Sequence, residues 1–260
     1  MSQSHHDYTD QAARYDRTRS ASPSVLRPLR AALSGAPGKH LVDVGGGTGN
    51  YSAALARDGF RPIVLDVSPE MLGRARTKGL AVLRGSAASL PVRDGVADAV
   101  SMVSMLHLVV EWRSALSEAR RVLRPGGALA IMAYTRDQLE VLWVLDYFPD
   151  TREWLAPEHQ SIDELVTELR GAQVTPFEFE DLDDGSMAAL CRHPHLILDS
   201  RRRAQTSYFE RLERSDPDAL RRGLDELERD LARGRRPQDE VSEARSRLGD
   251  GCVIAWTKPI

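Results

Sequence analysis

A run of glycines between a strand-like and a helix-like segment most limits how this chain can fold. Residues 41–59 read LVDVGGGTGNYSAALARDG, so Gly45, Gly46, Gly47 and Gly49 separate an apolar stretch from a helix-like one. Glycine weakens regular structure but allows backbone conformations and close approaches that other residues resist. The pattern predicts a strand that turns sharply into a helix, with a turn shaped to approach a ligand or another part of the chain.

The segments that follow alternate between strand and helix as far as about residue 135. Short apolar runs predict strands at 40–45, 61–67, 79–85, 96–106 and 128–134. Between them, helices are expected at 51–59, 68–76 and 112–123, the last ending at Pro125-Gly126-Gly127. Apolar strands alternating with helices are typical of a parallel sheet covered on both faces. We therefore expect an α/β protein with an open sheet.

Composition and charge exclude several other classes of protein. The 260 residues are 42% hydrophobic and carry a net charge of −3, which favours neither nucleic acid nor an anionic membrane as partner. Cys191 and Cys252 lie far apart, so neither a disulfide framework nor a structural zinc site is expected. The polar N-terminus and the short apolar runs predict a cytoplasmic protein. His5–His6 and His193–His195 fit a polar tail and a loop more easily than a metal site.

The spacing of the glycines separates two classes of ligand. A dinucleotide-binding turn has the pattern GxGxxG, but here the third glycine comes one residue early and Asn50 takes its expected position. A phosphate-binding P-loop is also absent, because no Gly-Lys-Ser/Thr sequence follows. The pattern that is present is DxGxGxG, from Asp43 to Gly49.

DxGxGxG resembles motif I of the class I S-adenosylmethionine (SAM)-dependent methyltransferases, in particular the branch that acts on small molecules such as quinone precursors and natural products. Three further segments resemble that family's motifs, in the same order and with similar spacing. These segments are VLDVSPEML (64–72), GSAASLPVRDGVADAV (85–100) and RVLRPGGALAI (121–131). The resemblance covers roughly residues 40–135. It implies a Rossmann-like sheet of about seven strands with an antiparallel last strand, for which residues 252–258 are suited, and SAM as cofactor.

The resemblance also implies a set of cofactor contacts. Gly45, Gly47 and Gly49 would let the backbone approach SAM, and Asp66 would accept hydrogen bonds from the ribose hydroxyls. Asp43 would orient the loop or meet the ligand's ammonium group. Ser86 and Ala87 would meet the adenine, although Ser86 stands where the family often has aspartate. We also expect contacts from Ser104 and from an N-terminal lid that carries Tyr15 and Arg19, although this segment could equally be an exposed helix.

Methyl transfer needs few catalytic groups, because the sulfonium already activates the methyl carbon. His107 follows the fourth strand and is the candidate base, or else a histidine that only lines the pocket. Trp143, Tyr147, Phe148 and Trp154 would suit an apolar or aromatic substrate, but they could equally form core. We expect a small-molecule substrate, no metal, and a monomer or homodimer.

The domain boundaries follow from these segments. We expect an N-terminal helical lid at 1–35, the cofactor-binding core at 36–182, a charged helical insertion at 183–250 on the substrate side, and the final strand at 251–260. Two other functions stay open. One is a SAM-binding protein that does not transfer methyl groups, and the other is a nicotinamide oxidoreductase, against which the early third glycine argues.

Overall fold

The fold is described from a computed structural model. It describes residue 16 and residues 19–180, 185–240 and 243–260. Tyr15 and most of the predicted N-terminal lid lie outside these ranges.

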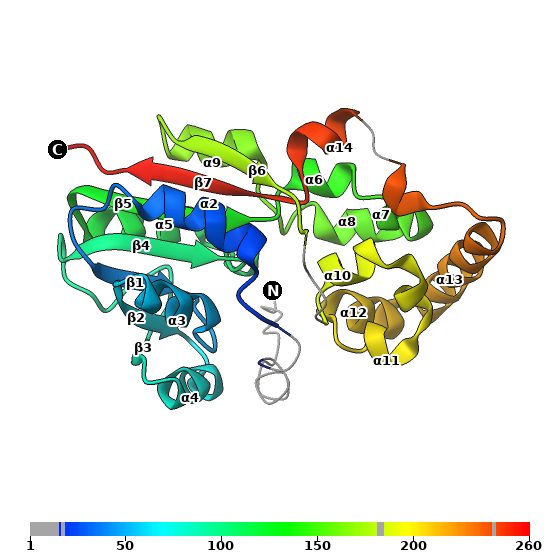
Figure 1. The fold of residues 1–260 in the computed structure, drawn as a ribbon, viewed down its shortest axis with the longest axis horizontal. Coiled ribbons are helices and arrows are strands. Elements are labelled where there is room, and N and C mark those ends of the chain that lie inside the picture. Colours follow the sequence, from blue (N-terminus) through cyan, green and yellow to red (C-terminus); the bar gives the residue numbers. More distant parts are fainter. Residues whose placement is uncertain (1–15, 17–18, 181–184, 241–242) are drawn as a thin grey trace.

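A seven-stranded sheet forms one half of the molecule (Figure 1). Its strand order is β3-β2-β1-β4-β5-β7-β6, and β7 runs antiparallel to both of its neighbours. The expected open sheet with an antiparallel last strand is therefore confirmed. The strands are β1 (His40–Val44), β2 (Arg61–Asp66), β3 (Ala81–Arg84), β4 (Ala97–Val103), β5 (Leu123–Ala133), β6 (Gln173–Phe177) and β7 (Gly251–Thr257).

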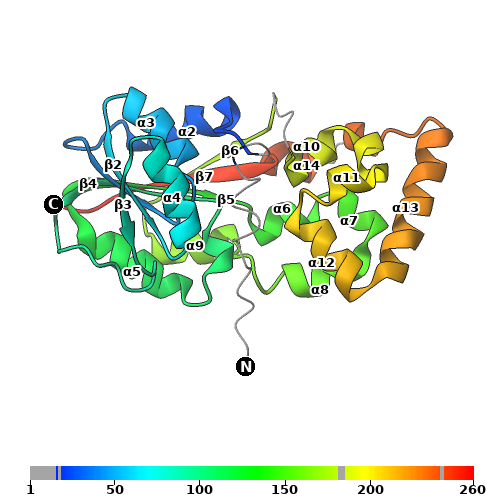
Figure 2. The ribbon, with the colours of Figure 1, turned by 90° about the horizontal axis from the view of Figure 1, so that it is seen from below.

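Helices cover both faces of the sheet, as buried apolar strands require (Figure 2). One face carries α2 (Pro23–Leu33), α3 (Asn50–Arg57) and α4 (Pro69–Thr77), whose apolar side chains join two of the buried clusters. The other face carries α5 (Trp112–Val122) and α9 (Ile162–Glu168). The predicted helix at 112–123 is one residue shorter than expected, because Leu123 already pairs with Ala97 and begins β5 ahead of Pro125.

The second half of the molecule is a helical subdomain, seen beside the sheet in Figure 1. It is made from two separate segments, 136–160 and 186–250, which share one apolar core around Leu145, Phe148 and Phe209. The expected helical insertion at 183–250 is thus only part of it, and β6 between the two segments belongs to the sheet. Its α-helices are α6 (Arg136–Glu140), α7 (Val144–Tyr147), α8 (Arg152–Leu155), α10 (Met187–Arg192), α11 (Ser200–Arg203), α12 (Ser207–Ser215), α13 (Pro217–Ala232) and α14 (Glu243–Leu248).

Part of the expected N-terminal lid belongs instead to the sheet half. Val25, Leu29 and Leu33 of α2 have no exposed surface and pack against the sheet. A lid role is therefore limited to residues before α2.

Both cysteines are buried free thiols. Within the described ranges, no helix combines the length and the apolar character that a bilayer span needs.

Candidate active site

The glycine-rich loop joins β1 to α3 at the carboxyl edge of the sheet. Gly45, Gly47 and Gly49 all have positive φ, at 65°, 55° and 77°. A Cβ atom on Gly45 would lie 2.8 Å from Met105, and one on Gly49 would lie 2.4 Å from Leu80. The nearest atom to a Cβ on Gly47, in contrast, is the Met71 sulfur at 4.0 Å. Two of the glycines thus serve close packing, while Gly47 leaves space beside the loop for a ligand.

Asp66 lies at the end of β2 and is bound to this loop. Its Oδ2 accepts a hydrogen bond from the Gly47 N–H at 2.9 Å, and its Oδ1 accepts one from the Ser68 N–H at 2.9 Å. Burial raises the pKa of the Asp66 carboxyl. Each carboxylate oxygen can accept more than one hydrogen bond. The structure therefore brings the predicted ribose acceptor and the glycine-rich loop together, and the carboxylate retains capacity for hydroxyl donors.

Asp43 lies beneath the loop rather than in the space beside it. It is 1% exposed, and its two oxygens accept hydrogen bonds from the hydroxyls of Ser52 at 2.6 Å and Ser101 at 2.7 Å. A Cβ on Gly46 would lie 2.6 Å from the Asp43 carboxylate. Asp43 therefore ties α3 and β4 to the base of the loop, which favours the orienting role over contact with a ligand's ammonium group.

The loop after β3 reaches the same edge. The Gly85 N–H donates to the Asp66 carbonyl at 3.1 Å, which ties this loop to the end of β2. The Ser86 hydroxyl accepts from the Ala88 N–H at 3.2 Å, whereas Ala87 and Leu90 are buried. The predicted adenine residues are thus adjacent to Asp66.

The end of β4 brings Ser104 and His107 to this edge. Ser104 has a φ of 51°, and its N–H donates to the Met132 carbonyl at 3.0 Å. A non-glycine residue in this conformation costs on the order of 1–3 kcal/mol and is typical of functional sites. His107 follows in a short 3-10 helix, Leu106–Leu108, and is half-buried.

His107 has a stacking partner that the sequence did not predict. Its ring lies parallel to that of His159, with centroids 4.8 Å apart and planes 6° apart. The His159 Nδ1 lies 2.9 Å from the Leu155 carbonyl, and burial lowers the pKa of this imidazole. His159 comes from the helical subdomain, 52 residues along the chain, and no motif marks it. The stack joins the two halves of the molecule beside the candidate active site.

Arg19 points toward the helical subdomain. Its guanidinium donates to the Gln205 carbonyl at 3.1 Å, and its own carbonyl accepts from the Asn50 side chain at 3.0 Å. The structure therefore places Arg19 next to the start of α3. Tyr15 lies outside the described residues, so its expected contact with the cofactor stays a prediction.

The aromatic residues of 143–154 mainly form core. Trp143, Tyr147 and Phe148 are at most 6% exposed and pack inside the helical subdomain. Trp154 is partly covered by the Arg211 guanidinium, 3.9 Å from its ring centroid. They therefore give little support to an apolar or aromatic substrate.

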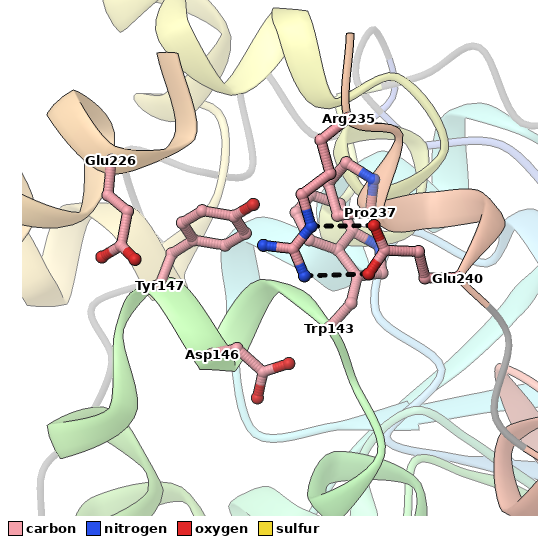
Figure 3. Close-up of a pocket in the computed structure, with 7 residues that line it drawn as sticks. All are labelled: Trp143, Asp146, Tyr147, Glu226, Arg235, Pro237 and Glu240. Atoms are coloured by element: carbon pink, nitrogen blue, oxygen red, sulfur yellow. Dashed lines mark hydrogen bonds and ion pairs between the residues drawn. The ribbon is translucent and has the colours of Figure 1, made fainter. Parts of the chain in front are cut away.

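A cavity of about 90 Å³ lies in the helical subdomain, among α7, α13 and residues 235–240 (Figure 3). Arg235 on its rim binds Glu240 and Asp230, and the Tyr147 hydroxyl also donates to Asp230. None of the predicted cofactor residues lines this cavity. Over the described part of the chain, no cluster of three or more His, Cys, Asp or Glu side chains could hold a metal.

The known proteins that resemble this chain include several methyltransferases. Residues 42–131 match a family model described as a methyltransferase domain. The chain is 36% identical over 135 residues to a demethylmenaquinone methyltransferase of Beutenbergia cavernae, a match covering 49% of this chain and 56% of the relative. It is 30% identical over 163 residues to the ubiquinone/menaquinone biosynthesis C-methyltransferase UbiE of a Caulobacter species, a match covering 55% of this chain and 65% of the relative. The chain thus spans between about half and two thirds of the length of these curated relatives.

A solved structure extends the likeness beyond the matched domain. The crystal structure titled putative methyltransferase from an antibiotic biosynthesis pathway of Anabaena variabilis shares the fold with a TM-score of 0.74 and 24% sequence identity. It covers 93% of this chain and 99% of that one, so the helical subdomain is included in the shared fold. Residues 42–131 thus match a methyltransferase domain, and the chain as a whole shares the fold of that solved structure.

Proposed function

We propose that the protein transfers the methyl group of SAM to an oxygen, nitrogen or carbon atom of a small molecule. The observation that carries this proposal is the hydrogen bond of 2.9 Å between the Gly47 N–H and the Asp66 carboxylate. It joins an open, glycine-lined surface to a hydroxyl acceptor at the carboxyl edge of the sheet, where ligands of open α/β sheets bind.

The residues present fit SAM. The loop Gly45–Gly49 would hold the methionine part, Asp66 the ribose hydroxyls, and Ser86 and Ala87 the adenine. When bound, SAM would supply a methyl group on a positively charged sulfonium. The methyl group is easily transferred, because the neutral thioether that remains is a good leaving group. The acceptor would take up this methyl group, and S-adenosylhomocysteine (SAH) would be the second product.

The chain's own contribution is to orient the acceptor, exclude water and receive a proton. His107 follows β4 in the short 3-10 helix, two residues after Met105, which packs against Gly45 of the glycine-rich loop. We propose that it receives the proton of a hydroxyl or amine acceptor. The helical subdomain would cover the acceptor, because it extends from the ends of β5 and β6 and its residue His159 stacks on His107.

The names of the relatives mention quinone and antibiotic biosynthesis. We propose that the acceptor is likewise a small molecule of the quinone or natural-product type. The cytoplasmic location and the monomeric or homodimeric state stay predictions.

Isothermal titration calorimetry with SAM, SAH and NAD tests the cofactor. We expect SAM and SAH to bind and NAD not to bind; binding of NAD alone would support the oxidoreductase instead. A turnover assay on a panel of phenols, quinols and amines, with SAH as the measured product, then tests the reaction. SAM binding without SAH formation on any acceptor would favour the non-catalytic alternative.

A further inference from the structure

Lys78 makes an unusually complete set of contacts around the glycine-rich loop. It is one of three lysines in the chain and follows the last residue of α4. Its ammonium lies 2.7 Å from the Asp16 carboxylate, 2.9 Å from the Thr48 carbonyl and 2.5 Å from the Asn50 side-chain oxygen. The Thr48 hydroxyl lies slightly further away, at 3.3 Å. The three donors of an ammonium group are thus all used.

Asn50 extends this set of contacts to Arg19. With its side-chain oxygen facing Lys78, its amide nitrogen donates to the Arg19 carbonyl at 3.0 Å. Asn50 is the residue that stands in place of the third glycine of a dinucleotide-binding turn. The contacts therefore give this substitution a physical role: its amide joins the glycine-rich loop to the segment that precedes α2. We call Asp16, Thr48, Asn50 and Lys78 the polar clamp.

The polar clamp is partly shielded from water. The side chains of Lys78 and Asp16 are 24% and 27% exposed, and Thr48 is buried. Burial acts to raise the pKa of the Asp16 carboxyl, but hydrogen bonds from Lys78 and Thr48 hold it below its ordinary value. Charged hydrogen bonds that are screened from solvent stabilise more than exposed ion pairs do.

The loop needs such support, because three of its five residues are glycines with positive φ. Glycine loses more conformational freedom on ordering than any other residue. Asp66 fixes the Gly47 N–H from the end of β2, and Lys78 fixes the carbonyl of the next residue, Thr48, from the end of α4. Two neighbouring loop residues are thus held by two different elements, which reduces the ordering cost that a ligand would otherwise meet.

We propose that Lys78 is a positioning residue for cofactor binding, which holds the glycine-rich loop through Thr48 and Asn50 and fastens Asp16 against it. This inference rests on the proposed function, because it assumes that the loop binds SAM.

Calorimetric titration of SAH into Lys78→Met tests the proposal. The expected result is an affinity at least about tenfold weaker than that of the wild type, since a set of charged hydrogen bonds is lost. Lys39→Met is the matched control, because Lys39 is an exposed lysine that lies over the Phe60 ring. It should bind SAH as the wild type does. Lys78→Arg should not restore the affinity, because a planar guanidinium cannot copy the geometry of an ammonium.

Asp16→Ala provides a second test outside the sheet. We expect weaker SAH binding, and the effects of Asp16→Ala and Lys78→Met should be less than additive in the double variant. Asp58→Ala removes a surface ion pair with Arg30 and is its control. A wild type that does not bind SAH would overturn the proposed function itself. A wild type that binds SAH, with Lys78→Met or, if that variant does not fold, Asp16→Ala binding equally well, would overturn only the role of Lys78. A lowered melting temperature with unchanged affinity would likewise show a purely structural role.

Discussion

Asp66 is the residue at which cofactor binding can be tested with least disturbance of the fold. It lies at a strand end and contacts the loop through one carboxylate oxygen. We expect Asp66→Ala to weaken SAH binding by roughly 1–3 kcal/mol, the range for leaving polar partners without a hydrogen bond. Titration calorimetry measures this, and circular dichroism should show an unchanged fold. Wild-type affinity in a folded variant would exclude the ribose role.

Asp43 should make stability depend on pH in a defined direction. Burial raises the pKa of this carboxyl above 3.8, against the effect of hydrogen bonds from Ser52 and Ser101. The folded state therefore binds the proton more tightly than the unfolded state, so the wild type gains stability as pH falls from the raised pKa to about 3.8.

The Asp43→Asn variant has no carboxyl group that could take up a proton at this position. The free energy of unfolding of the wild type relative to Asp43→Asn should therefore increase as pH falls from 7 to 4, measured by urea unfolding. Other carboxyls titrate in both proteins and cancel in the difference. If the difference in unfolding free energy between the two proteins did not depend on pH, the pKa of Asp43 would not be raised in the folded state.

His107 can be tested once the substrate panel gives an active acceptor. If it receives the proton, His107→Ala should lower turnover roughly 100-fold or more while SAH affinity stays nearly unchanged. Activity of the wild type should then fall as acidic pH protonates the imidazole. If His107 only lines the pocket, the loss should fall mainly on KM, and His107→Gln should restore most of it. Near-normal turnover of His107→Ala at saturating substrate would exclude the base role.

At the scale of elements, the contact between α7 and α13 depends on one glycine. A Cβ on Gly223 would lie 2.2 Å from the Phe148 ring and 2.4 Å from the Tyr147 carbonyl. We expect Gly223→Ala to destabilise the protein by about 1–3 kcal/mol through overpacking, measured by urea unfolding.

Gly73→Ala is the control, because Gly73 also lies inside a helix but a Cβ there would meet no atom within 4 Å. This change should be neutral or stabilise by about 0.5–1 kcal/mol, the usual gain from glycine to alanine in a helix. Equal effects of the two substitutions would contradict the close contact at Gly223.

The sequence predicts elements well where burial leaves a local pattern. Residues of β1 and β4 are mostly apolar because these strands are covered on both faces, and the glycine turn marks the ligand edge. The helical subdomain is less predictable. Helices α6, α7 and α8 have only four or five residues each, too few to show a helical period. These helices share an apolar core with residues 186–250, and that core depends on contacts between segments that are distant in the sequence.

The site shows the same division. Gly47 and Asp66 could be recognised from motif spacing. Gly47 belongs to the motif that follows β1, and Asp66 is the last residue of β2. His159 and Lys78 could not, since their roles arise from contacts 52 and 28 residues away. The expected contact of Arg19 with the cofactor stays a prediction; in the structure its guanidinium donates to the Gln205 carbonyl.

At the scale of the whole molecule, two contacts between the sheet half and the helical half involve predicted site residues. His107 with His159 and Arg19 with Gln205 cross from the sheet half to the helical half. Each joins a residue next to the glycine-rich loop or β4 with one from the helical subdomain. Two of the contacts between the halves therefore lie beside the candidate active site.

The helical subdomain enters the chain at two points, after β5 and after β6, and each time the chain returns to the sheet. Both insertions follow residue 131, the last residue of the matched methyltransferase domain. Mutations in the helical subdomain can thus accumulate without altering any residue of that domain. Under the proposed function, such a division would let a lineage exchange one acceptor for another while it inherits residues 42–131 unchanged.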